Sequence, residues 1–387
     1  MPSIASEMRK FVAPEFVFGV GSAGLAGAYA SNLGARKCLV VTDPHILGTG
    51  LLAPVLTSLT EAGIPFTVFS GVSPNPKDHE VAAGARIYAR ERCDCLVAVG
   101  GGSPMDCAKG IGIVSTNGRH ILDFEGVDMV EKPGPPLICI PTTSGSAAEV
   151  SQFAIITHCG QRRKIAIVSK TVVPDTALVD PELTVTMNRR LTAATGMDTL
   201  THAIEAYVSN ASSPVTDLLA LEAVRLVSGS LRRACDHPDD LAARSDMAQA
   251  CLLAGLAFSN AILGAVHAMA HSLGGFLDLP HGECNAILLP AVVDRNYTAA
   301  PQRFDRIAEA LGLDLAGRDA DARREALVAT LARMKIEVGI TDTLRALGVR
   351  PEDLDTLAEN ALADPCMVTN PCALRKDDVE KLYEQSF

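Results

Sequence analysis

The stretch VAVGGGSPMDCAKGI, residues 97–111, decides the fold class because it joins three local signals. The apolar run over 95–99 is typical of a buried strand, and three glycines form a tight loop directly after it. Ser103 and Pro104 then mark a helix start, because serine caps helix N-termini and proline fits the first turn. The stretch therefore predicts a strand, a glycine loop and a helix, which is the repeating unit of α/β sheets.

The same alternation continues on both sides of this stretch. Short β-branched runs occupy residues 37–43, 65–71 and 136–142, and Ala-rich helical patterns separate them. Because parallel strands need crossover helices, this alternation predicts a mostly parallel sheet. A turn signal near residue 180 ends the last strand-like run, so we expect the α/β domain to occupy residues 1–184.

Beyond Leu191 the β-branched runs fade and helical patterns take over. We therefore expect an all-helical domain over residues 185–387. The long Ala/Leu-rich segments that predict its helices are 191–209, 215–235, 240–275 and 302–313.

Composition excludes several classes of protein. The 387 residues are enough for two cores, and the net charge of -11 argues against a nucleic-acid partner. The amino terminus has no apolar core of a secretory signal, so we expect a cytoplasmic protein. Polar residues and glycines interrupt the most apolar stretch, 252–279, which favours a pair of buried helices over a membrane-spanning helix. We therefore expect no membrane partner. The odd total of eleven cysteines predicts reduced, mostly buried thiols.

Two glycine loops compete for a phosphate group. FGVGSAGL at 18–25 matches the dinucleotide pattern G-x-G-x-x-G, but Pro14 lies where a central strand should precede it. The loop after residues 95–99 follows a clear strand and opens a helix, whose first N–H groups and dipole attract anions. We favour this second loop for a pyrophosphate, with a plain tight turn as the alternative.

Two further positions point to a nucleotide. Asp43 follows the strand run 37–41, where an acid hydrogen-bonds an adenosine ribose and repels the 2'-phosphate of NADP. It therefore favours NAD, although a turn aspartate remains the alternative. A loop of small hydroxyl residues, PTTSGSAAEVS at 141–151, follows another strand and presents Thr142, Thr143 and Ser146 to the same edge of the sheet.

Three of the nine histidines lie within GAVHAMAHSLGGFLDLPHGECNAILLP, residues 264–290. His267 and His271 are four residues apart on a predicted helix, so their side chains share one face. The glycine pair that follows predicts the helix end, and Pro280 fixes a short return to His281.

A second pair has the same spacing. Asp198 and His202 lie four residues apart on the predicted helix 191–209, in a stripe that also contains Glu205. Two such pairs and a third histidine after a turn together predict a metal site.

At this point the chain resembles the iron-dependent (group III) alcohol dehydrogenases over essentially its whole length. The branch it resembles contains the short-chain alcohol, 1,3-propanediol and methanol dehydrogenases. The resemblance implies a Rossmann-like NAD-binding domain and a helical metal-binding catalytic domain, an architecture shared with dehydroquinate synthase. The motifs that carry it are FGVGSAGL, SPNPKDHEV, GGGSPMDCAKGI, IPTTSGSAAEVS, HAMAHSLGG, PHGECNAILLP and the pair Asp198-x3-His202.

The resemblance assigns roles by position. It implies that a divalent metal, usually Fe2+ with Zn2+ as the second candidate, is held by Asp198, His202, His267 and His281. His271 is then not a ligand, although its spacing alone would nominate it; it lies beside the nicotinamide and takes part in proton transfer. Phe153 and Phe258 are implied to wall the substrate cleft. The positions expected to contact NAD are Asp43, Asn75, Gly101, Gly102, Ser103, Asp106, Thr142, Thr143, Ser146, Lys164, Leu183 and His271. The resemblance therefore implies that the loop FGVGSAGL does not bind the pyrophosphate, although it matches the dinucleotide pattern.

Two positions depart from the commonest family pattern. Ser146 stands where threonine is more frequent, and Cys372 stands where arginine often follows Asn-Pro. Both changes bear on substrate choice rather than on the reaction.

The expected activity is hydride transfer between NAD and a small primary alcohol, diol or aldehyde, with the metal lowering the pKa of the alcohol. Few basic residues accompany the metal motifs, which argues against anionic substrates. The family assembles as dimers or as larger assemblies of dimers, so a homo-oligomer is expected. The alternatives are a dehydroquinate synthase-like lyase, which would need a Lys/Arg cluster, and a regulatory protein on the same fold.

Overall fold

The computed structural model describes residues 10–387 and contains one large and one small sheet. The large sheet has six parallel strands in the order β1-β9-β6-β4-β2-β3. Its strands are β1 (Glu15–Phe18), β2 (Cys38–Val41), β3 (Phe66–Phe69), β4 (Cys95–Gly100), β6 (Leu137–Pro141) and β9 (Thr176–Val179).

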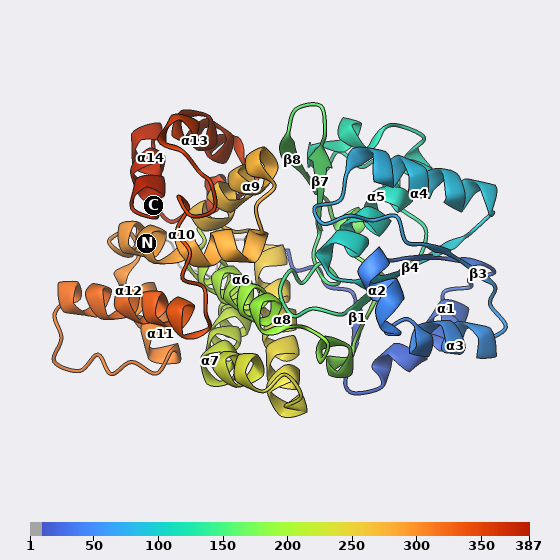
Figure 1. Cartoon of the computed structure of the whole chain (residues 1–387), viewed down its shortest axis with the longest axis horizontal. Helices are drawn as coiled ribbons and strands as arrows, with labels where there is room; N and C mark the ends of the chain where they lie inside the picture. Colours follow the sequence, from blue (N-terminus) through green and yellow to red (C-terminus); the bar gives the residue numbers. More distant parts are fainter. Residues whose placement is uncertain (1–9) are drawn as a thin grey trace.

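Helices cover both faces of this sheet (Figure 1). Alternate residues of a strand point to opposite faces, so Leu96 of β4 packs with α4 and α5, whereas Val97 packs with α1 and α3. Burial on both faces explains why these strands read as continuous apolar runs. The helices are α1 (Ala26–Asn32), α2 (Pro44–Thr49), α3 (Ala53–Glu61), α4 (Asp78–Arg90) and α5 (Gly102–Asn117). Short 3-10 segments are η2 (Ser22–Leu25), η3 (Ile121–Phe124), η4 (Lys170–Val172) and η5 (Pro181–Thr184).

The small sheet is a feature that the sequence did not predict. It contains β5 (Gly126–Val127), β7 (Phe153–His158) and β8 (Arg163–Val168), and the last two form an antiparallel hairpin. Strand β7 contacts α5, and β8 contacts α9 of the helical part. The hairpin therefore lies between the large sheet and the helices that follow (Figure 1).

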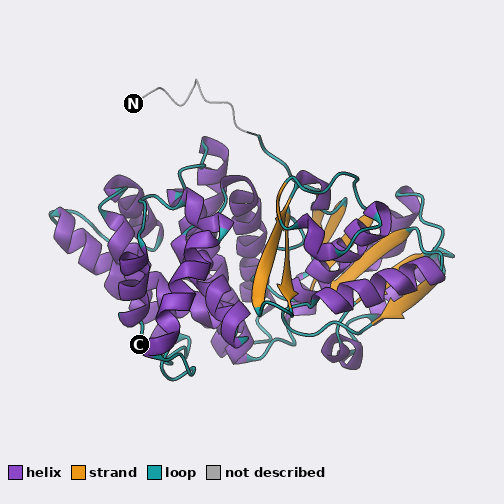
Figure 2. Cartoon of the chain, turned by 90° about the horizontal axis from the view of Figure 1, so that it is seen from above, coloured by secondary structure: helices purple, strands orange, loops and turns teal. Residues whose placement is uncertain are grey.

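From residue 189 onward every regular element is a helix, and these helices share one large core (Figure 2). The predicted mostly parallel α/β sheet followed by a helical region is confirmed. The α-helices are α6 (Arg189–Val208), α7 (Pro214–Asp236), α8 (Leu241–Ala261), α9 (Ala265–Leu277), α10 (His281–Tyr297), α11 (Pro301–Ala310), α12 (Ala320–Glu337), α13 (Leu354–Ala363) and α14 (Lys376–Glu384), with 3-10 segments η6 (Pro351–Asp353) and η7 (Pro365–Thr369).

The expected pair of buried helices in the apolar stretch is confirmed, but the predicted end of the second helix needs correction. The chain breaks at Ile262, whose φ is 62°, and α9 leaves α8 at 98°. Gly274 and Gly275 do not end α9, which runs on to Leu277. A Cβ on Gly275 would lie 2.7 Å from the backbone nitrogen of Lys164, so this glycine lets β8 approach the helix.

Two expectations from composition concern cysteines and apolar helices. All eleven cysteines are free, and nine of them are buried; Cys159 is exposed and Cys372 is half-buried. No single helix among residues 10–387 is long and apolar enough to cross a membrane, and α8 with α9 meets that criterion only as a bent pair.

Candidate metal centre and nucleotide-binding edge

The four predicted metal ligands converge from three helices. Asp198 and His202 lie on α6, His267 lies on α9, and α10 begins at His281. The Nε2 atoms of His202, His267 and His281 lie 3.9, 3.5 and 3.7 Å from Oδ1 of Asp198. Donor atoms bound at about 2.1 Å around one tetrahedral ion lie about 3.4 Å apart. Donor atoms of Asp198, His267 and His281 all lie within 4.8 Å of one another, so these three side chains are already spaced like the ligands of a single metal ion. His202 lies outside this group and approaches it through Asp198.

Glu205 sets the tautomer of His267. Its Oε2 lies 2.6 Å from Nδ1 of His267, and since a carboxylate can only accept, this nitrogen carries the hydrogen. Burial lowers the pKa of His267, but hydrogen bonds to Asp198 and Glu205 outweigh it and raise the pKa to about 9. Loss of the Nε2 proton would give the carboxylate–histidine–metal arrangement, in which a metal binds at Nε2. Glu205 Oε1 also accepts the backbone N–H of Val266 at 2.7 Å, in the first turn of α9.

The charges in the cluster suit a divalent cation. Burial lowers the pKa of His202 to about 3 and the pKa of His281 well below its ordinary value, so both rings are neutral. Burial alone would raise the pKa of Asp198, but His202 and the other histidines hold it below its ordinary range. A carboxylate and imidazoles are donors that Fe2+ and Zn2+ both accept, so the residues present fit such an ion.

His271 lies beside this cluster, and its Nδ1 atom faces the carboxylate of Asp364. Its ring stacks on His281, with centroids 5.2 Å apart and planes at 12°. Its Nδ1 lies 2.9 Å from Oδ2 of Asp364, so this N–H donates to a largely buried carboxylate. A cavity of about 450 Å³, whose lining includes Glu125 and Lys164, reaches both His271 and Asp364. The arrangement can hold a proton between the cluster and this cavity.

The predicted phosphate loop and hydroxyl loop lie side by side. Strands β4 and β6 are neighbours, and Gly101 and Gly102 open α5 at the carboxyl end of β4. A Cβ on Gly102 would lie 2.9 Å from Ser146, and one on Gly101 would lie 3.2 Å from the hydroxyl of Thr143. The helix begins earlier than predicted: its N-cap is Gly101, and Ser103, the predicted cap, lies two residues later inside the first turn of α5. Both loops therefore border one edge of the sheet, where ligands of open α/β sheets bind.

The rival loop at 18–25 is differently built. It follows β1, the edge strand of the large sheet, and continues into the short segment η2. The backbone N–H of Ala23 in this loop donates to Oδ2 of Asp180 at 3.2 Å. A carboxylate already occupies this amide and would repel a phosphate, so the loop is poorly suited to a pyrophosphate.

Comparison with known proteins agrees with this geometry. A model of the iron-containing alcohol dehydrogenases matches residues 13–181, and a model of the C-terminal part of the same family matches residues 192–387. The chain belongs to the iron-containing alcohol dehydrogenase family. The recognition made from the motifs is thereby confirmed.

Individual members of the iron-containing alcohol dehydrogenase family are similar over their full length. The 1,3-propanediol dehydrogenase of Klebsiella pneumoniae is 42% identical over 372 residues, 96% of each chain. The NAD-dependent methanol dehydrogenase of Bacillus methanolicus is 39% identical over 377 residues, 97% of this chain and 99% of the relative. A crystal structure of 1,3-propanediol oxidoreductase superposes with a TM-score of 0.96 at 41% identity, covering 98% of this chain and 100% of the other.

The remaining predicted cofactor residues of this chain lie on several different elements. Asn75 Nδ2 donates to Asp278 at 2.6 Å and so links the α4 loop to α9, while Lys164 packs its amine beside Gly274. Thr142 is buried after β6, and Leu183 is buried in η5.

Two of the predicted cofactor carboxylates have other partners. Asp43 Oδ1 accepts the N–H of Ile46 at 2.8 Å and caps α2, as a turn aspartate does. Asp106 Oδ2 accepts the N–H of Ile155 on β7 at 3.2 Å, and burial raises the pKa of this carboxyl to about 6. The Asp106 side chain therefore faces β7 rather than the glycine loop.

The two predicted substrate-wall residues meet near the metal cluster. The rings of Phe153 and Phe258 lie 5.9 Å apart, and Phe258 stacks on His202 at 4.4 Å. They give one side of the cluster an apolar wall.

Three residues with clear roles were missed or left without a role by the sequence. Fully buried Asn285 donates from Nδ2 to Asp198 at 2.7 Å, and the same atom lies 3.1 and 3.2 Å from Nε2 of His267 and His281. Its position four residues after His281 on a helix was a signal that could have found it. Glu205 stood on the Asp198 stripe without an assigned role, and Asp364, 93 residues beyond His271, gave no local signal.

Proposed function

We propose that the chain is an NAD-dependent alcohol dehydrogenase that also reduces the corresponding aldehydes. The observation that carries the proposal is the convergence of Asp198, His202, His267 and His281 beside a glycine loop at the edge of a parallel sheet. Family membership and the similarity to enzymes named for 1,3-propanediol and methanol support small primary alcohols and diols as substrates. Fe2+ is the proposed metal, and Zn2+ fits the same donors.

A bound divalent metal would supply Lewis-acid chemistry that makes the alcohol more acidic. The side chains of the protein exclude water from the reacting carbon and place the group that accepts the alcohol proton. Phe153 and Phe258 exclude water from one side of the reacting carbon, which favours hydride transfer over side reactions. His271 takes the alcohol proton on the nitrogen facing the cluster, while Asp364 holds its other nitrogen and orients the ring.

The cofactor would lie along the sheet edge. We propose that Gly101, Gly102 and Ser103 hold the pyrophosphate with their backbone N–H groups, with the adenine near Thr142 and Thr143. Asp43 would hydrogen-bond the adenosine ribose while it caps α2, because a carboxylate has a second oxygen. The positions proposed to line the rest of the cofactor are Asn75, Asp106, Ser146, Lys164, Leu183 and His271.

Gly102→Ala should raise the KM for NAD about tenfold or more while the metal content stays unchanged. The added methyl group would lie 2.9 Å from Ser146 and must push the two loops apart. Gly24→Ala is the matched control, since nothing lies within 4 Å of a Cβ there and the lookalike loop should not bind NAD. Steady-state kinetics with varied NAD would distinguish the two loops. A larger rise in KM for Gly24→Ala than for Gly102→Ala would contradict the proposal and place the cofactor at the loop 18–25.

Activity itself is tested by following NADH formation with a panel of short alcohols and diols. The protein would be stripped of metal and reloaded anaerobically with Fe2+ or Zn2+. Metal-dependent turnover with a short alcohol is expected, and its preference order would name the substrate. Tight NAD and metal binding without turnover on any alcohol would instead favour the regulatory reading, and turnover of a phosphorylated keto acid would favour the lyase.

We further propose that residues 1–184 and 185–387 act as two domains of a cytoplasmic homo-oligomer, a dimer or an assembly of dimers. The separate family models for the two parts and the large shared core of the helices support the division. The net charge of -11 supports the expectation that neither nucleic acid nor membrane is a partner. Light scattering of the metal-loaded enzyme would test the assembly.

A further inference from the structure

A second cluster of metal-binding side chains lies at the start of α4, away from the cluster around Asp198. Its backbone is fixed by pairing: Lys77 and Thr157 form a parallel β-bridge, and the N–H of Thr157 donates to the carbonyl of Pro76 at 2.8 Å. This bridge holds the N-cap of α4 beside the end of β7. His79, in the first turn of α4, therefore lies close to Cys159, at the tip of the β7–β8 hairpin.

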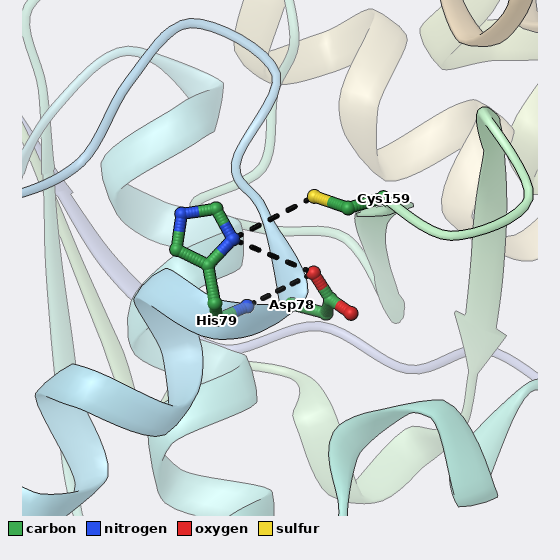
Figure 3. Close-up of side chains that lie close together, drawn as sticks. All are labelled: Asp78, His79 and Cys159. Atoms are coloured by element: carbon green, nitrogen blue, oxygen red, sulfur yellow. Dashed lines mark hydrogen bonds and ion pairs between the residues drawn. The ribbon is translucent and has the colours of Figure 1, made fainter.

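The side chains of Asp78, His79 and Cys159 turn toward one another (Figure 3). Nδ1 of His79 lies 3.6 Å from Sγ of Cys159 and 3.6 Å from Oδ1 of Asp78, and the three donor atoms all lie within 4.8 Å of one another. A separation of 3.6 Å is too long for a good nitrogen–oxygen hydrogen bond. With Zn–S near 2.3 Å and Zn–N or Zn–O near 2.1 Å, however, a sulfur–nitrogen edge of a tetrahedral zinc site measures about 3.6 Å and a nitrogen–oxygen edge about 3.4 Å.

Exposure leaves room for a fourth ligand. The side chain of Asp78 is 16% exposed and that of His79 is 70% exposed, so the cluster opens to water on one side. Burial of the carboxylate on the protein side and a free face on the other is the arrangement of a site with three protein ligands and one water molecule.

We propose that Asp78, His79 and Cys159 form a second metal site, which takes Zn2+ with a water molecule as the fourth ligand. A thiolate and an imidazole select a borderline-soft ion and disfavour Mg2+ and Ca2+, which prefer oxygen donors. The ion would clip α4 to the β7–β8 hairpin. Both segments continue directly into contacts with α9, through Asn75 to Asp278 and through Arg162 to the carbonyl of Phe276. The clip would therefore stiffen the part of the sheet region that touches the helices.

The chemistry of the two sites allows a clean test with Co2+. A thiolate bound to Co2+ gives a charge-transfer band in the near ultraviolet, and the cluster around Asp198 contains no thiol. Addition of Co2+ to the metal-loaded enzyme should therefore produce this band at about one equivalent per chain. Loss of the band in Cys159→Ser would distinguish the second site from the buried thiol of Cys366, which lies beside His271 and Asp364.

Three variants decide the assignment. Cys159→Ser should abolish the band and His79→Ala should abolish or strongly weaken it, whereas Cys372→Ser, at the other cysteine that is not buried, should leave it unchanged. Alcohol turnover should persist in all three, because none of these residues lies in the proposed catalytic cluster. The proposal is overturned if the wild type gives no band, if the band survives Cys159→Ser, or if His79→Ala binds Co2+ like the wild type. Circular dichroism would verify that each variant is folded.

Discussion

His202→Ala should empty the metal centre and reduce alcohol turnover by about a thousand-fold or more. A Lewis-acid metal contributes several kcal/mol of transition-state stabilisation, and about 1.4 kcal/mol corresponds to a factor of ten in rate. His202 is the most informative ligand to remove, because its loss strands no buried partner. Removal of His267 would leave the buried carboxylate of Glu205 without its partner at 2.6 Å and would confound metal loss with unfolding.

The measurement combines metal analysis with steady-state kinetics on the Fe2+-loaded protein. His237→Ala is the control, since this exposed histidine follows α7 far from the ligands in sequence and should retain full metal content and turnover. Full metal occupancy together with near-normal turnover in His202→Ala would rule out the proposed ligand set.

The second large effect is expected at His271. His271→Ala should reduce kcat by about a hundred-fold to ten-thousand-fold, the usual contribution of a general acid or base. The metal content should not change, because His202, His267 and His281 approach Oδ1 of Asp198 within 3.9 Å, whereas His271 makes its close carboxylate contact with Asp364. Asp364→Asn should give a smaller loss, since the imidazole keeps a hydrogen-bonding neighbour but loses the charged acceptor that orients it.

A control variant shares the same cavity. Asn360 also lines it and should tolerate replacement by alanine with turnover within about twofold. If His271→Ala lost the metal, the ring would have to be counted as a ligand, as its helical spacing alone suggested. If kcat stayed normal in both His271→Ala and Asp364→Asn, the proton would have to leave by another route.

The parts of the fold that were predictable are those set by local pattern. The strand, glycine loop and helix at 97–111 occur as expected because burial on both faces makes the strand uniformly apolar. The proposed ligands Asp198 and His202 were identified as a pair because helical spacing places them on one face. Pairing of α6 with α9 and α10 needed the family resemblance, since periodicity does not say which helices meet.

The errors have tertiary causes. Gly274 and Gly275 carry the composition of a helix end, but their real function is to admit the backbone of β8, a segment more than a hundred residues earlier in the chain. Asp106 lies in the first turn of α5, and its carboxylate also accepts the N–H of Ile155 on β7, a contact that the local pattern did not indicate. Neither partner was visible from local sequence.

The β7–β8 hairpin has a mechanical consequence. Buried Lys109 of α5 donates to the carbonyls of Ser151 and Phe153 at the base of β7, while Gly275 of α9 receives the backbone of β8. One face of the hairpin thus packs on the sheet region and the other on the helices, so a relative movement of the two parts would have to disrupt its contacts on one side. The sheet region and the helices follow one another in the sequence, but both pack against the β7–β8 hairpin. Each part would therefore lose some of its packed surface without the other.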